Sequence, residues 1–117
     1  MANAFTTHNL SESTDCMPIQ IWTTANPGVL IHTAGSGTTN YDEIVLYVNN
    51  TSGGKVLVTL QWGNLLPSGY WCEWVQPYTT HIIAPSLKLQ NSRQIRAFAA
   101  TANVINIAGD VTRNTVT

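Results

Sequence analysis

The stretch "YDEIVLYVNNTSGGKVLVTLQWG", Tyr41 to Gly63, decides the fold class. Residues 43–48 and 56–62 each place apolar side chains at every second position, which is the period of a half-buried β-strand. Between them, residues 49–54 ("NNTSGG") are rich in types that accept a positive φ angle, as hairpin loops require. The stretch therefore predicts two antiparallel strands joined as a β-hairpin.

Short apolar strands between turn residues continue on both sides of this stretch. Further strands are expected at residues 19–23, 29–33, 70–75, 78–83, 87–89, 95–100 and 104–111, with the last two forming a second pair. About eight short antiparallel strands predict one all-β domain, a β-sandwich, over residues 17–117. The pattern fits either a jelly-roll or an immunoglobulin-like topology.

The N-terminal residues 1–16 are polar and show no period, which predicts an extended arm, either disordered or ordered by a partner. The arm carries no basic segment followed by an apolar segment, so we expect no secretory signal and synthesis in the cytoplasm. Apolar runs elsewhere are too short to span a membrane.

The composition points to a protein that works inside an assembly. Only 9 % of the 117 residues are charged, against roughly 25 % in an ordinary soluble domain. The net charge is −1 and the basic residues are scattered, so contacts with nucleic-acid phosphates are not expected. A surface built from Thr, Asn, Ser and Gln suits a chain that is packed against neighbours.

No pattern of residues predicts catalysis or a bound cofactor. The three histidines, His8, His32 and His81, lack a nucleophile motif beside them, and we expect each to be a satisfied surface or interface residue. Asp42 and Glu43 are adjacent, so in a strand they point to opposite faces and cannot act as a pair. We expect no enzyme activity, no catalytic residue, no metal site and no cofactor.

The two cysteines, Cys16 and Cys72, lie far apart in the sequence. Two reduced, partly buried thiols are expected in a reducing compartment. A disulfide that ties the arm to the tryptophan-rich segment is the alternative.

Aromatic residues are the main candidates for binding. Trp62 continues the apolar face of its strand and is expected in the core, whereas Trp71 and Trp74 are an odd number of positions apart and must face opposite sides of a strand. The loop at residues 63–70 is the expected contact region. The predicted interface residues are Trp71, Trp74, Tyr70, Trp22, Leu65, Leu66 and Phe5.

Two segments resemble small structural proteins of tailed-bacteriophage virions. They are Tyr41 to Gly63, with its "LYVN" and final Trp-Gly, and "LKLQNSRQIRAFAATANVINIAGDVTR", Leu87 to Arg113. Together they cover about half of the chain. The stretch between Pro67 and Pro85 has no counterpart in this pattern. The resemblance implies a β-sandwich that decorates or cements a capsid or forms the base of a head spike, often as a trimer.

Two functions from different classes follow. The first is a capsid decoration or cement protein on the virion surface, whose partners are the major capsid protein and copies of itself, with a trimer favoured. The second is a carbohydrate-binding β-sandwich that stacks host-surface glycans on exposed rings. Other virion parts, such as a tail or head–tail adaptor component, are further alternatives. No nucleic-acid or membrane partner is expected.

Overall fold

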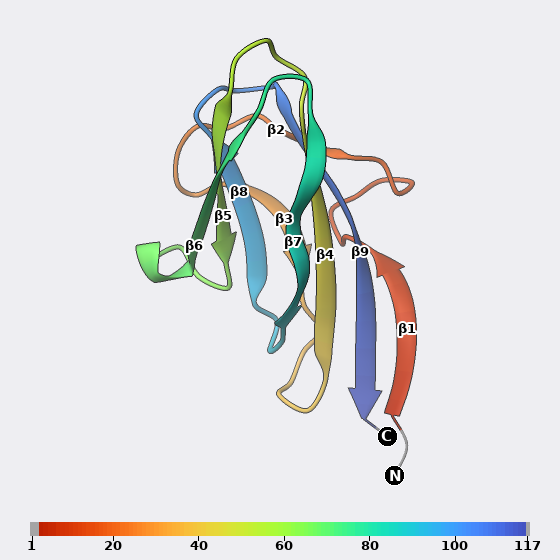
Figure 1. The fold of residues 1–117 in the computed structure, drawn as a ribbon. Helices are drawn as coiled ribbons and strands as arrows, with labels where there is room; N and C mark the ends of the chain where they lie inside the picture. Colours follow the sequence, from red (N-terminus) through yellow and green to blue (C-terminus); the bar gives the residue numbers. More distant parts are fainter. Residues whose placement is uncertain (1–2, 117) are drawn as a thin grey trace.

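The computed structural model, which describes residues 3–116, consists of two antiparallel β-sheets packed face to face (Figure 1). Residues 1–2 and 117, at the ends of the predicted arm and domain, lie outside the described residues. The elements are β1 (Asn3–Asn9), β2 (Ile19–Ile21), β3 (Val29–Thr33), β4 (Tyr41–Asn50), β5 (Val56–Trp62), the 3-10 turn η1 (Pro67–Gly69), β6 (Tyr70–Val75), β7 (Thr80–Leu89), β8 (Gln94–Ala99) and β9 (Ile105–Val116).

The strand order is that of a jelly roll. One sheet runs β1-β9-β4-β7, with β2 also paired to β9, and the other runs β3-β8-β5-β6. β1 pairs with β9, β3 with β8, β4 with β7 and β5 with β6, all antiparallel. The chain is therefore one long antiparallel hairpin that is rolled into two layers, with its tip between β5 and β6. The predicted β-sandwich is confirmed, and the order selects the jelly roll over the immunoglobulin-like alternative.

The hairpin predicted at residues 43–62 is wrong. β4 pairs with β7 and β9, whereas β5 belongs to the opposite sheet and pairs with β6 and β8. The buried side chain of Asn50 guides the crossing, because its Nδ2 donates to the carbonyls of Gly54 and Val75 at 2.9 and 3.0 Å. Alternation shows that a strand has one buried face, but both sheets of a sandwich have one, so the pattern does not say which sheet a strand joins.

The second predicted pair is wrong for the same reason. β8 lies in the sheet with β3 and β5, while β9 lies in the other sheet with β1, β2 and β4. The two segments predicted at residues 78–83 and 87–89 form the single strand β7, whose pairing with β4 shifts register twice near Pro85.

Part of the predicted N-terminal arm is a strand of the same sheet. Residues 3–9 are extended and pair along their whole length with β9, from Asn3 opposite Val116 to Asn9 opposite Asp110. The two described ends of the chain therefore lie side by side (Figure 1).

The core lies between the two sheets and is aliphatic. Each inner face supplies every second residue of its strands, as the alternation in the sequence requires. The largest fully buried apolar side chains are Leu10, Ile21, Ile31, Ile44, Leu46, Leu60, Ile95, Ile105 and Ile107. Trp62, expected in the core, is partly buried and packs against this cluster.

Candidate functional site

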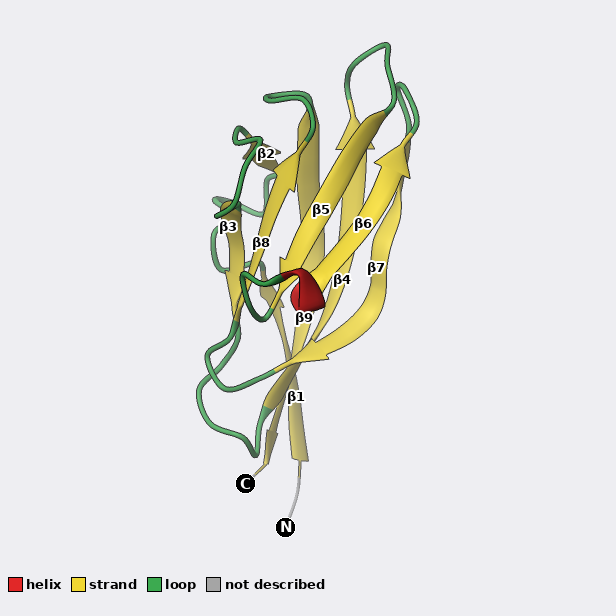
Figure 2. Cartoon of the chain, turned by 90° about the vertical axis from the view of Figure 1, so that its left-hand side faces the viewer, coloured by secondary structure: helices red, strands yellow, loops and turns green. Residues whose placement is uncertain are grey.

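The candidate site is a row of mainly apolar and aromatic residues, two of them exposed, on the outer face of the β3-β8-β5-β6 sheet, which faces the viewer in Figure 2. We call it the aromatic strip. Its members are Tyr70, Cys72 and Trp74 of β6, Leu57 and Thr59 of β5, and Phe98 of β8.

The register of the strands puts these residues on one face. Val58 and Leu60 point into the core, so Leu57 and Thr59 between them point outward. Trp74 lies opposite Leu57 and Cys72 opposite Thr59. On its other side Thr59 lies opposite Phe98. The strip therefore crosses three neighbouring strands.

Contacts within the strip hold some rings and leave others open. The rings of Tyr70 and Phe98 meet edge to face, with centroids 5.8 Å apart and an interplanar angle of 76°. Thr59 is covered and its Oγ1 lies 3.6 Å from the Cys72 Sγ. Trp74 stays 51 % exposed, with the Lys55 ammonium 4.8 Å from its ring centroid.

One end of this sheet face is closed by the chain itself. The side chain of Gln61 is fully buried there, because it accepts from the Gly28 N–H at 2.7 Å and donates to the Asn26 Oδ1 at 2.7 Å. The backbone at Gly28 approaches β8 so closely that a Cβ would lie 2.5 Å from the Ala97 carbonyl carbon. The segment at residues 26–28 therefore covers the outer face of β5 beyond the strip.

The predicted interface residues fall in several places. Tyr70 and Trp74 lie in the strip, and Trp71 points to the other face of β6, opposite the inward-pointing Leu60. Both tryptophans are about half exposed, at 54 % for Trp71 and 51 % for Trp74. The parity expected from their spacing therefore holds in the structure.

The other predicted interface residues are exposed but lie outside the strip. Leu65 and Leu66 lie at the hairpin tip before η1, and both are exposed. Phe5 is 62 % exposed on β1, which lies on the opposite side of the molecule from β6 (Figure 1). Trp22 follows β2 directly and is 63 % exposed.

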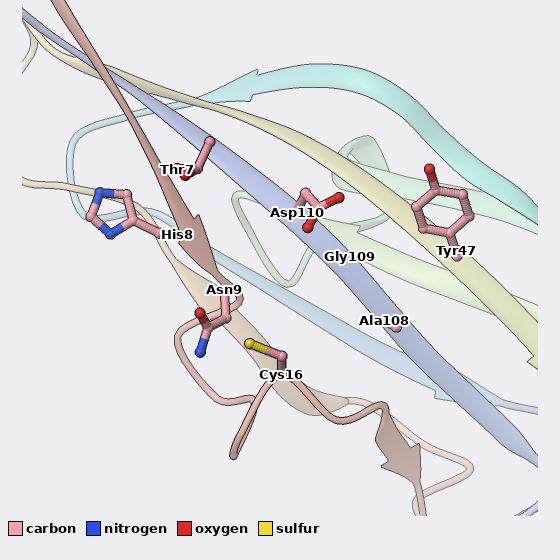
Figure 3. A pocket seen from close by; sticks show the side chains of 8 residues that line it. All are labelled: Thr7, His8, Asn9, Cys16, Tyr47, Ala108, Gly109 and Asp110. Carbon is pink, nitrogen blue, oxygen red and sulfur yellow. The ribbon is translucent and has the colours of Figure 1, made fainter.

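The two thiols are free and exposed, so the expectation of partly buried thiols is wrong, and no disulfide joins them within the chain. Cys72 belongs to the strip. Cys16 lies beside Asn9 in an open groove of about 380 Å³ over the other sheet, lined also by Tyr47 and Asp110 (Figure 3). The two thiols therefore lie on the outer faces of different sheets.

A second cluster of polar groups is buried between the sheets at the start of β4. The Asp42 carboxylate accepts from Arg113 Nε at 2.7 Å and Nη2 at 3.0 Å, and its Oδ2 lies 2.8 Å from His32 Nε2. His32 Nδ1 accepts from the Ser11 N–H at 2.9 Å, so Nε2 carries the ring proton and donates to Asp42. His32 is 1 % exposed, which corrects its predicted place at the surface or an interface.

The electrostatics of this cluster fit a structural role. Burial lowers the pKa of His32, and this effect outweighs the hydrogen bond to Asp42, which raises it. Burial raises the pKa of Asp42, but hydrogen bonds from Arg113 and His32 bring it below its usual value. The hydrogen bond to Asp42 raises the pKa of Arg113. The neutral imidazole of His32 and the Asp42–Arg113 ion pair therefore satisfy each other's hydrogen bonds.

The other two histidines are less buried. His8 is exposed and its Nε2 lies 2.9 Å from the Thr6 Oγ1. His81 Nε2 lies 2.9 Å from Glu73 Oε1, at ion-pair distance but without an aligned hydrogen bond. This contact places β6 beside β7 at one side of the sandwich.

Within residues 3–116, no group of three His, Cys, Asp or Glu side chains is placed to hold a metal ion. Over the same residues, no helix is long and apolar enough to cross a membrane.

Comparison with known proteins finds similarity in the fold. No family model matches the sequence. No curated protein matches it either. One solved structure, described as "Bacillus endospore appendages form a novel family of disulfide-linked pili", superposes with a TM-score of 0.58 over 100 % of this chain and 93 % of that chain. The two sequences are 13 % identical, so this likeness shows the fold alone.

Sequence reasoning missed Leu57, Phe98 and Lys55 as members or neighbours of the strip. Leu57 and Phe98 each alternate with buried residues of their strands, and this alternation alone predicts that they point outward. What the sequence did not carry was that β8, β5 and β6 lie side by side, because this depends on the jelly-roll order.

Proposed function

We propose that this chain is a non-enzymatic structural protein of a virion surface, a capsid decoration protein that docks its aromatic strip onto the major capsid protein. The observation that carries the proposal is the strip itself. It is a charge-poor row on an open sheet face, with Trp74 half exposed and Tyr70 and Phe98 partly exposed, and not a cleft that would enclose a small molecule.

The setting on a virion is supported by the resemblance of residues 41–63 and 87–113 to phage structural proteins. Jelly rolls are a frequent fold of viral capsid domains. The similar fold of a Bacillus endospore appendage protein is a further case of this architecture in a structure described as pili. The chain is made in the host cytoplasm and joins the shell as a homo-oligomer, a trimer. Each copy contributes part of the binding free energy that stabilises the shell.

The carbohydrate-binding alternative is less well supported by the geometry. Stacking on sugar faces favours rings that present flat surfaces in one plane, whereas Tyr70 and Phe98 meet at 76°. Trp71 and Trp74 point to opposite faces of β6 and do not form a shared platform.

The test is sedimentation of the purified chain with empty shells assembled from the co-encoded major capsid protein. We expect saturable binding with a fixed ratio of chain to shell subunits. Absence of binding to the shells, together with a tryptophan fluorescence response to a glycan panel, would replace the proposal with the carbohydrate-binding one. Absence of both responses would remove both functions.

A further inference from the structure

The edge strands of the sandwich differ in how well their backbones are protected. A free sheet edge exposes unpaired N–H and C=O groups and pairs readily with another strand, so proteins usually block it with bulges, proline, lysine or covering segments. The edges are β1, β2 and β7 in one sheet and β3 and β6 in the other. β2 is only three residues long, and such short edge strands offer little to pair with.

β3 and β7 are blocked. β3 has a register shift between Leu30 and His32, and the N-terminal segment covers it, since the Glu12 N–H donates to the Ile31 carbonyl and the Thr33 N–H to the Ser11 Oγ. β7 carries Pro85, Lys88 and two register shifts. The Trp62 indole also donates to the Lys88 carbonyl at 3.3 Å.

β1 and β6 have none of these features. Both pair with their neighbours without a register shift. β1, "NAFTTHN", has no charge and no proline, and β6, "YWCEWV", has one charge, Glu73, which faces His81 of its own chain. Within the described chain, the backbone of residues 4–9 bonds only to β9, and that of residues 71–74 only to β5.

The two open edges lie on opposite sides of the molecule. β6 lies beside β7 through the Glu73–His81 contact, and β7 is at the far end of the sheet from β1. Figure 1 shows β1 on the right, beyond β9, and β6 on the left. A copy that offers β6 to β1 of another therefore keeps its own β1 free for a third.

We infer that copies of this chain associate head to tail, with β1 of one copy adding as a strand to β6 of the next. The partner is a second copy because the two open edges match: seven and six residues long, regular, almost uncharged, and one from each sheet. Pairing also covers exposed rings beside the two edges, Phe5 on β1 and Trp71 on β6. Trp74 points to the outer face of β6 and stays available to the shell.

This contact is heterologous, so it closes into a ring if the rotation between copies allows and otherwise continues as a filament. The inference deepens the proposed assembly by naming the contact between copies. It needs no shell, so it is tested on the purified chain alone.

Cysteine cross-linking between two single-cysteine proteins tests the inference. One protein carries Cys16→Ser and retains Cys72 on β6. The other carries Cys16→Ser and Cys72→Ser with one new cysteine on β1, in four versions: Phe5→Cys, Thr6→Cys, Thr7→Cys and His8→Cys. The two proteins are mixed, oxidised gently with copper–phenanthroline and separated by non-reducing electrophoresis, with unfolding curves as the check on folding.

We expect disulfides between the two different proteins to exceed those between two copies of the same protein by about tenfold or more. Their yield should alternate along positions 5 to 8, because neighbouring residues of a paired strand face opposite sides. Dominant Cys72–Cys72 or β1–β1 products would overturn the inference in favour of two-fold pairing. Equal yields at all four positions, or no cross-link, would overturn it as well.

The outcome separates from that of the proposed function. Alternating cross-links without binding to shells would retain the head-to-tail contact and remove the capsid role. Binding to shells without these cross-links would do the reverse.

Discussion

The Asp42–His32–Arg113 cluster and the aromatic strip both collect side chains that often carry function, yet they differ in exposure and in pairing. In the cluster, Asp42 and His32 are buried and every bond that joins the three side chains is between 2.7 and 3.0 Å. In the strip, Trp74 and Cys72 are exposed. Satisfied, buried polar groups therefore stabilise the sandwich, while an exposed ring such as that of Trp74 is available to a partner.

The largest expected effect is on stability, from Asp42→Asn. This substitution removes the charge that pairs with Arg113, and breaking such a pair costs about 3 kcal/mol. Urea unfolding measures the change. Glu43→Gln, one position away on the outward side of β4, is the matched control and should stay within about 0.5 kcal/mol of the wild type. Equal losses in both variants would contradict the structural role of the cluster.

The next effect is on docking, from Trp74→Ala. Loss of this exposed tryptophan of the strip should weaken binding to the shells by about 2 kcal/mol, or roughly 30-fold. The free energy of unfolding should fall only by about 0.5 kcal/mol, through loss of the contact with Lys55. Sedimentation with shells gives the affinity. Tyr47→Ala, on the outer face of the other sheet, is the control and should bind as the wild type does. If the Tyr47 variant bound as poorly as the Trp74 variant, the assignment of docking to the outer face of the β3-β8-β5-β6 sheet would be wrong.

The pH dependence of stability tests the neutral, buried state of His32 in the Asp42–His32–Arg113 cluster. The folded pKa of His32 lies below its ordinary value of 6.5, so the unfolded chain takes up the proton first and stability falls as the pH drops below about 6.5. Asp42, whose folded pKa lies below 3.8, adds a further loss below about pH 4. Urea midpoints between pH 7 and 5 measure the first loss. His8→Gln, at an exposed histidine, should leave it intact, and a flat profile would contradict the neutral, buried state of His32.

The smallest effect compares two cation–π pairs, one on each sheet. Lys55 lies over Trp74 at 4.8 Å and Lys88 over Tyr41 at 4.9 Å. Replacing either lysine with alanine should lower stability by about 0.5 kcal/mol. Only Lys55→Ala should also change docking, since only Trp74 lies in the strip. The same docking change in both variants would indicate general loss of surface charge as the cause.

The sequence predicted the β-sandwich because period-two alternation in segments such as residues 43–48 and 56–62 reports one buried face per strand. It failed at strand pairing, since β4 and β5 carry the same alternation whether they share a sheet or face each other across the core. The opposite facing of Trp71 and Trp74 was predictable because it depends on alternation within one strand. Strand pairing was not predictable because it depends on how separate strands are arranged.

The candidate site was predictable only in part. Tyr70 and Trp74 were found because they are large apolar residues in a charge-poor chain. Phe98 and Leu57 come from other strands that the jelly-roll order brings alongside β6, and no local pattern contains that order. The role of His32 was missed because its partners, Ser11, Asp42 and Arg113, lie far apart in the sequence.

Oxidative footprinting by hydroxyl radicals tests the central claim most directly, because it reads the exposure of single side chains in the free chain and on assembled shells. The proposed docking predicts that Trp74, Tyr70 and Phe98 are oxidised several-fold more slowly on the shell, while Tyr47 on the other sheet keeps its rate. Protection of Tyr47 with unchanged oxidation of Trp74 would contradict the claim that this protein docks through the aromatic strip.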